Sequence, residues 1–136
     1  MNKTIIAICL LLMSLSFSAY SIRGGARGGG MAIGINKQPL SYTQWLWGYG
    51  AEVTTGKNNF LIYASVNQII TQKGKGYPVF LSFGPIASVG NTSSIGGFAH
   101  VGWLGIFDTP NLLFEIGLDI TTKESSMCAE FAYRFN

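Results

Sequence analysis

The residues that could do chemistry in this chain are few, and histidine is the scarcest of them. His100 is the single histidine of the 136 residues. An imidazole beside a hydroxyl group favours nucleophilic catalysis, because the imidazole takes the proton of the attacking oxygen. Glu115 could orient such a ring, and the serines that could supply the nucleophile are Ser82, Ser88, Ser93 and Ser94. Hydrolysis of an ester centred on His100 is therefore one function to test.

Charged residues recur at even spacings in the second half of the chain. Glu115 and Asp119 are four residues apart, and so are Glu130 and Arg134. In an extended strand, residues at even spacing point to the same side. If that side is an interior of low dielectric, the charges must pair to remain ionised. We predict an interior polar cluster, centred on Arg134 with Glu130 and Glu115, with Arg27 as a further candidate and with the full set Glu52, Glu115, Asp119, Glu130 and Arg134.

Other kinds of site lack their signature. Arg23 and Arg27 lie among five glycines, but no strand signal precedes this segment and no Gly-Lys-Ser/Thr follows it, so a phosphate-binding loop is not indicated. We interpret the segment as a flexible basic stretch that touches lipid phosphates or is simply disordered. His100 and Cys128 make no metal-ligand spacing, so neither a metal nor a cofactor is expected. The charge balance gives no support to nucleic-acid binding.

The first residues are typical of an export signal. Lys3 is followed by an apolar run over residues 5–13, which is too short to span a membrane permanently. Cleavage after Ser21 places small residues, Ala19 and Ser21, at the two positions that a signal peptidase reads. The predicted organisation is a signal peptide over 1–21 and one mature domain over 22–136. That domain holds one cysteine and cannot form an internal disulfide.

The rest of the chain reads as short strands. Apolar segments of about ten residues alternate with clusters of turn residues, and none keeps a helical period. Only 11% of residues are charged whereas 48% are apolar, and a soluble domain usually carries about a quarter charged residues. The seven segments are 30–36, 41–53, 59–70, 77–90, 94–107, 111–121 and 127–136.

Alternation along these segments separates two faces. From Leu112 to Ile120 every second residue is large and apolar, while the positions between include Gly117 and two acids. Small residues suit the interior of a narrow barrel, and large apolar residues suit hydrocarbon outside it. A soluble periplasmic β-sandwich that binds an apolar ligand would also alternate and is kept as an alternative. Aromatic residues near segment ends predict girdles at the two membrane interfaces, formed by Trp45, Trp47, Tyr77, Trp103, Tyr133 and Phe135.

The last six residues, Phe-Ala-Tyr-Arg-Phe-Asn, alternate and nearly end on an aromatic. With the export signal and the alternating strands, they make the chain resemble small outer-membrane β-barrels of Gram-negative bacteria, of the OmpX or OmpA-transmembrane type. The resemblance implies an all-β fold, an antiparallel up-and-down transmembrane barrel of eight strands, inserted by machinery that reads a terminal aromatic. Asn136 after Phe135 departs from that pattern. The eighth strand must come from 22–29 or from a divided segment; otherwise another chain completes the barrel.

The expected function is that of a non-enzymatic outer-membrane barrel, structural or of surface-interaction type. The interior of an eight-stranded barrel has room for side chains but not for an open channel. The alternative is that the interior polar cluster forms a path for protons or small solutes. Expected partners are outer-membrane lipid and the insertion machinery, with a homo-oligomer as a further option. The enzymatic alternative is an outer-membrane lipid-modifying hydrolase that uses His100. Lipid A deacylases, which are barrel enzymes of that membrane, carry His-x-Ser-Asn, whereas His100 precedes Val-Gly-Trp, so their motif is absent. If the C-terminus is periplasmic, the outward connections 54–58, 90–94 and 121–126 are short and leave little surface for adhesion.

Overall fold

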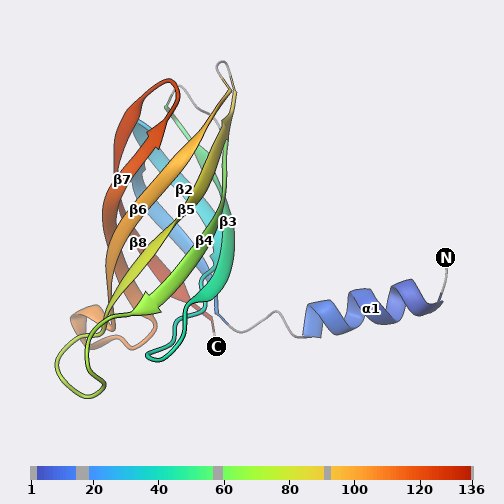
Figure 1. Cartoon of the computed structure of the whole chain (residues 1–136), viewed down its shortest axis with the longest axis vertical. Helices are drawn as coiled ribbons and strands as arrows, with labels where there is room; N and C mark the ends of the chain where they lie inside the picture. Colours follow the sequence, from blue (N-terminus) through green and yellow to red (C-terminus); the bar gives the residue numbers. More distant parts are fainter. Residues whose placement is uncertain (1–2, 15–18, 57–59, 91–92, 136) are drawn as a thin grey trace.

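The computed structural model describes residues 3–14, 19–56, 60–90 and 93–135. Eight antiparallel strands form a closed barrel (Figure 1), and each strand pairs with the next along the chain until β8 pairs with β1. No helix in these ranges is long and apolar enough to cross a membrane. The elements are α1 (Lys3–Ser14), β1 (Tyr20–Arg27), β2 (Gly30–Lys37), β3 (Leu46–Thr54), β4 (Phe60–Ile69), β5 (Val79–Val89), β6 (Ser94–Leu104), the 3₁₀ helix η1 (Ile106–Asp108), β7 (Leu112–Thr121) and β8 (Ser125–Arg134).

The eighth strand comes from the glycine-rich segment, which confirms 22–29 as its predicted source. The interpretation of the same segment as a flexible stretch is wrong. β1 pairs with β2 through the register Arg27↔Gly30 and with β8 through Gly25↔Glu130. A Cβ atom on Gly25 would stand 2.2 Å from the carbonyl oxygen of Ala129, closer than any real contact. The glycine that makes this segment a poor strand by propensity is therefore what allows β1 to close against β8.

A two-residue turn joins β1 to β2. Gly28 and Gly29 have φ angles of 64° and 78°, and two consecutive positive φ values are what the type I′ hairpin turn requires. Residues with a Cβ avoid this conformation, so the glycine pair fixes the position of the turn.

The seven predicted segments correspond to β2–β8, and the largest differences in bounds are at two ends. Residues 41–45 precede β3 as part of a connection, and the chain leaves β6 after Leu104. Gly105 and Phe107 adopt φ angles of 76° and 53°, which turn the chain into η1. Phe107 therefore does not continue the strand. Asn136, the predicted last strand residue, lies outside the described residues.

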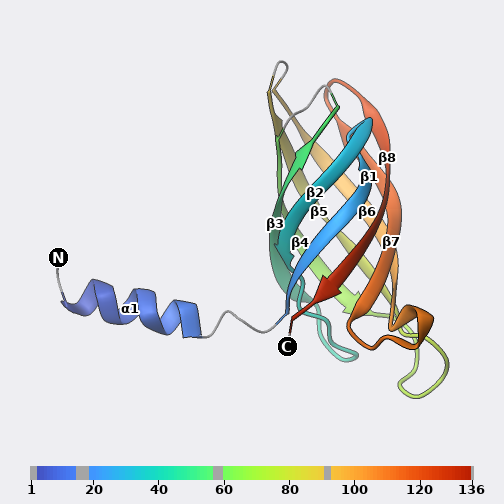
Figure 2. The ribbon, with the colours of Figure 1, turned by 180° about the vertical axis from the view of Figure 1, so that it is seen from behind.

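The two ends of the barrel differ. We call the end where β1 begins and β8 ends the terminal end, and the opposite end the turn end; Figure 2 shows the C-terminus among the connections of the terminal end. The connections of the terminal end, 38–45, 70–78 and 105–111, have eight, nine and seven residues. Those of the turn end, 28–29, 55–59, 90–93 and 122–124, have two to five. The chain outside the barrel wall is therefore concentrated at the terminal end.

Apolar side chains face outward and charged ones inward. Ile33 is 64% exposed, Trp47 73% and Met127 74%, whereas Arg27 and Glu52 are each 1% exposed. Two apolar clusters also lie inside, one toward the turn end and one toward the terminal end. They are Leu61, Tyr63, Ile86 and Phe98, and Ile69, Phe80, Leu113 and Ala132. Along β4 the inward residues Ser65 and Asn67 separate the two clusters.

Candidate functional site

Seven ionisable side chains meet inside the barrel, and we call them the interior cluster. They are Arg23 and Arg27 of β1, Glu52 of β3, His100 of β6, Glu115 and Asp119 of β7, and Glu130 of β8. Each residue is at most 3% exposed. Alternation brings them together, because the members on each strand occupy inward positions of the pleat. Inward glycines make room; a Cβ on Gly34 would lie 2.4 Å from Cγ of Glu52.

Arg23 links β1 to three other strands. Its Nη2 donates to Glu115 Oε2 at 2.8 Å, and its Nε lies 3.5 Å from Glu130 Oε1. Its Nη1 donates to the hydroxyl of Tyr63 at 3.1 Å. One guanidinium thus compensates two carboxylates and also satisfies a buried phenol.

Arg27 holds the remaining two acids. Its Nε and Nη2 donate to the two carboxylate oxygens of Asp119 at 2.8 and 3.1 Å, which is the bidentate arrangement, and its Nη1 pairs with Glu52. The guanidinium carbon lies 4.6 Å from the centre of the Tyr63 ring and 5.5 Å from that of Phe98. Packing against two aromatic faces suits a planar cation in a dry site.

Both nitrogens of His100 are occupied by acids. Nδ1 lies 2.9 Å from Glu115 Oε1, and Nε2 lies 2.9 Å from Asp119 Oδ1. Carboxylates accept hydrogen bonds, so each ring nitrogen donates and the ring is an imidazolium in this arrangement. A Cβ on Gly117 would lie 2.4 Å from the ring, so glycine is needed there to seat the histidine. Neither nitrogen is left to act as a general base.

The serines offer no nucleophile to His100 among the described residues. Ser88 and Ser94 bond to each other, with 2.6 Å between their oxygens. Ser82 faces inward opposite His100 in the register of β5 and β6, and no hydroxyl group in the described ranges bonds to the ring. The geometry that lipid hydrolysis would require is not formed there.

Charges in the interior cluster balance when one acid carries a proton. Two arginines and the imidazolium supply three positive charges against four carboxyl groups. Glu130 accepts from the thiol of Cys128 at 3.0 Å, while one oxygen of Glu130 and one of Glu52 have no hydrogen-bond partner. An extra buried negative charge would be costly, so a proton on one of these two carboxyls completes the cluster.

The predicted interior residues are placed as follows. Glu52, Glu115, Asp119 and Glu130 lie together inside the barrel, whereas the half-buried Arg134 makes no ion pair with any described residue and its Nε has no partner. The predicted centre on Arg134 is instead supplied by two arginines of β1. Sequence reasoning missed Arg23, although its four-residue spacing from Arg27 matches that of Glu115 from Asp119.

The predicted interface aromatics gather at one end only. Trp45, Trp47, Tyr77, Tyr133 and Phe135 are exposed, and Trp103 is partly buried. All six lie in the connections of the terminal end or in the adjoining strand residues. At the turn end the outward residues are mainly aliphatic, such as Met31, Val53 and Ile95. The six predicted aromatics therefore form one belt at the terminal end and not two girdles, while Phe60, 40% exposed, is an outward aromatic at the turn end.

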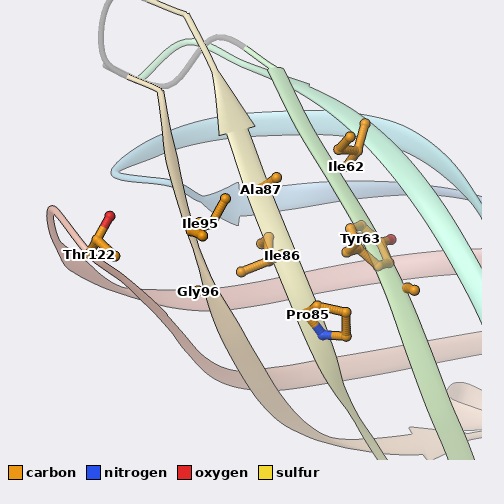
Figure 3. Close-up of a pocket in the computed structure, with 9 residues that line it drawn as sticks. Ile62, Tyr63, Pro85, Ile86, Ala87, Ile95, Gly96 and Thr122 are labelled. Atoms are coloured by element: carbon orange, nitrogen blue, oxygen red, sulfur yellow. The ribbon is translucent and has the colours of Figure 1, made fainter.

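A shallow groove of about 720 Å³ runs over the outer wall of β4, β5 and β6 (Figure 3). Its floor is formed by small residues, Ala64, Pro85 and Ala87, with Ile62 and Ile95 at its sides. Pro85 has no N–H, and the pairing of β4 with β5 skips this position. No Lys, Arg, His, Asp or Glu lines the groove, so it offers a surface for apolar contact rather than a place for chemistry.

The described residues contain no group of three or more His, Cys, Asp or Glu side chains able to hold a metal ion. No protein-family model matches the sequence, and neither a curated protein nor a solved structure matches it.

Proposed function

We propose that this protein is an integral β-barrel of the outer membrane, structural or of surface-interaction type, without an open channel. The observation that carries the proposal is the inverted distribution of its side chains. Water-soluble proteins expose their charges and rarely expose large continuous apolar surfaces. Here the ionisable side chains of the interior cluster are buried, and the outer wall displays Ile33, Ile35, Trp47, Ile95, Ile120 and Met127.

The dimensions of the barrel support a location in lipid. Its strands have 8 to 11 residues, close to the 9–11 tilted residues that span a bilayer. Closure pairs both edges of every strand, which satisfies the backbone where no water is present. A closed barrel is also not a two-sheet sandwich, so the soluble-sandwich alternative loses its structural basis.

The filled interior supports a role without transport. The interior cluster is fully buried, and apolar side chains lie toward both ends of the barrel. An eight-stranded barrel is wide enough to be filled by side chains but too narrow for a water-filled pore. The sealed cluster also argues against the alternative of a solute path.

Electrophoretic mobility tests the membrane barrel. A tagged chain, produced with its own signal in a Gram-negative host, should be recovered in the outer-membrane fraction and should change mobility in SDS when boiled. A closed barrel resists detergent until it is heated, which produces the shift. Recovery as a soluble periplasmic protein would overturn the proposal.

Conductance in planar bilayers tests the sealed interior separately. The purified, heat-modifiable protein should give no steady single-channel current. Discrete current steps from a correctly folded sample would show that the interior conducts and would overturn the structural role.

A further inference from the structure

A second hollow lies outside the barrel wall at the terminal end. It measures about 540 Å³ and is lined by Tyr77, Trp103, Ile106, Phe107, Phe114 and Phe131. Sites for small ligands commonly measure about 300 to 1,000 Å³ and are lined by apolar and aromatic side chains. Five of its six lining residues are aromatic, so it differs in character from the aliphatic groove of Figure 3.

Its floor is a row of rings across three neighbouring strands. The registers Trp103↔Phe114 and Phe114↔Phe131 place these side chains next to one another on β6, β7 and β8. Trp103 stacks on Phe114 with 6.2 Å between ring centres, and Phe114 lies 4.8 Å from Phe131. The row gives a continuous apolar surface on the outer wall.

One side of the hollow is built from unusual backbone. Phe107 and Asp108, neither of them glycine, have φ angles of 53° and 56°. Left-handed conformations of such residues are unfavourable and are concentrated at functional sites. Here they leave the Phe107 ring 76% exposed beside the hollow. Exposure of this apolar ring to water is unfavourable, whereas contact with lipid would be favourable.

The connection that contributes Tyr77 to the hollow also carries positive charge. The hydroxyl of Tyr77 donates to Asp108 Oδ1 at 3.5 Å, which joins the connection 70–78 to η1, and Figures 1 and 2 both show these segments side by side. Lys73 and Lys75 are exposed in that connection, within four residues of Tyr77. Asp108 is the only acid of the three connections at the terminal end, and it is engaged by Tyr77.

We infer that this hollow binds one anionic glycerophospholipid of the adjoining leaflet. An acyl chain lies on the aromatic row beside Phe107, and the phosphate is held by Lys73 and Lys75. Aromatic rings with nearby lysines are the combination that favours the headgroup level of a membrane and anionic lipids there. The inference rests on the proposed membrane location and adds to it a preference for lipid charge.

Tryptophan fluorescence gives a local test. In a background with Trp45→Phe and Trp47→Phe, Trp103 is the one remaining tryptophan of the three. The protein is reconstituted in equimolar phosphatidylglycerol and phosphatidylcholine, with bromine on the acyl chains of one lipid or of the other. Quenching of Trp103 should be at least twofold stronger when phosphatidylglycerol carries the bromine, and the difference should shrink in high salt.

Two variants and one control decide the assignment. Lys73→Gln with Lys75→Gln should abolish the difference, and Phe107→Ser should reduce it. Lys123→Gln removes a lysine from the turn end and should leave the difference unchanged. Equal quenching by both lipids, or a difference that survives loss of both lysines, overturns the inference while the barrel stands. Absence of the boiling shift in the parent protein instead overturns the proposed membrane location.

Discussion

At the scale of single residues, the interior is organised by two arginines of one strand. Arg23 and Arg27 lie on β1, and each contacts acids from more than one other strand. Buried charges are tolerated when they are paired, and loss of one partner leaves an uncompensated charge. The consequences of substitution should therefore depend on which partner each variant removes.

Arg27→Met should be severely destabilising. It removes the guanidinium that pairs with Glu52 and Asp119, so the free energy of unfolding should fall by about 3 to 5 kcal/mol. Urea unfolding of the barrel refolded in lipid vesicles measures this. Glu130→Gln is the matched control, because its side chain keeps its size and a neutral form balances the interior cluster; its cost should stay near 1 kcal/mol. Equal costs for the two variants would contradict this account.

His100→Ala should affect stability and not catalysis. The substitution leaves Glu115 and Asp119 without their imidazolium donor, which should cost about 1 to 3 kcal/mol. Release of fatty acid from lipid vesicles should be at background for both the parent protein and the variant. Hydrolysis by the parent that disappears in a folded variant would instead restore the enzymatic alternative.

At the scale of elements, the strands were predictable wherever large apolar residues alternate with small or charged ones. β7 is the clearest case, because Glu115, Gly117 and Asp119 alternate with aliphatic residues. β1 was not predictable by the same rule, since its outward positions include glycine and its inward ones arginine. Its role depends on contacts with β8, which a local pattern does not contain. Arg23, the partner that the predicted interior cluster lacked, lies on this strand.

Gly25→Val should prevent closure of the barrel. The new side chain would meet the backbone of Ala129 and Glu130, which belong to a paired strand and cannot move away. The heat-shifted band should be lost. Gly97→Ala is the control, because a Cβ there meets its nearest neighbour at 3.5 Å, an ordinary contact, and the shift should remain. A Gly25→Val protein that still shifts on boiling would contradict the role given to this glycine.

The start of β1 also bears on export processing. Tyr20 belongs to the strand, its carbonyl accepts from the Phe135 amide at 2.7 Å, and the Ser21 side chain is buried against Asn36. Cleavage after Ser21, as the sequence pattern predicts, removes Tyr20 and Ser21 together with these two contacts. We expect the exported chain to retain Tyr20 and Ser21, and the intact mass of the purified protein will show it. A mass that begins at Ile22 would mean that the barrel closes with a shorter first strand.

At the scale of the whole molecule, the two ends of the barrel are unequal. The terminal end carries the longer connections and the aromatic belt. Segment lengths alone indicated that the connections of the turn end are short. The predicted up-and-down order already places the six aromatics at one end, because the starts of 41–53 and 77–90 and the ends of 94–107 and 127–136 lie at the same end. The prediction of two girdles did not use this order.

Accessibility of tags on intact cells tests the orientation. With both termini in the periplasm, an epitope inserted after Lys123 should be stained on intact cells. One inserted after Gly74 should be stained only when the outer membrane is permeabilised. The reverse pattern would place the longer connections on the cell surface and make them the candidates for external contacts.

Closure between the first and last strands also constrains how the protein can be made. Ser21 pairs with Arg134, 113 residues later in the chain, and the arginines of β1 form ion pairs with acids on β7 and β8. The sheet keeps two unpaired edges until the final strand has been synthesised and has paired with β1. If the protein reaches the outer membrane as proposed, the chain must cross the periplasm unfolded and bound to chaperones. A truncation that removes β8 should yield an aggregate rather than a smaller barrel.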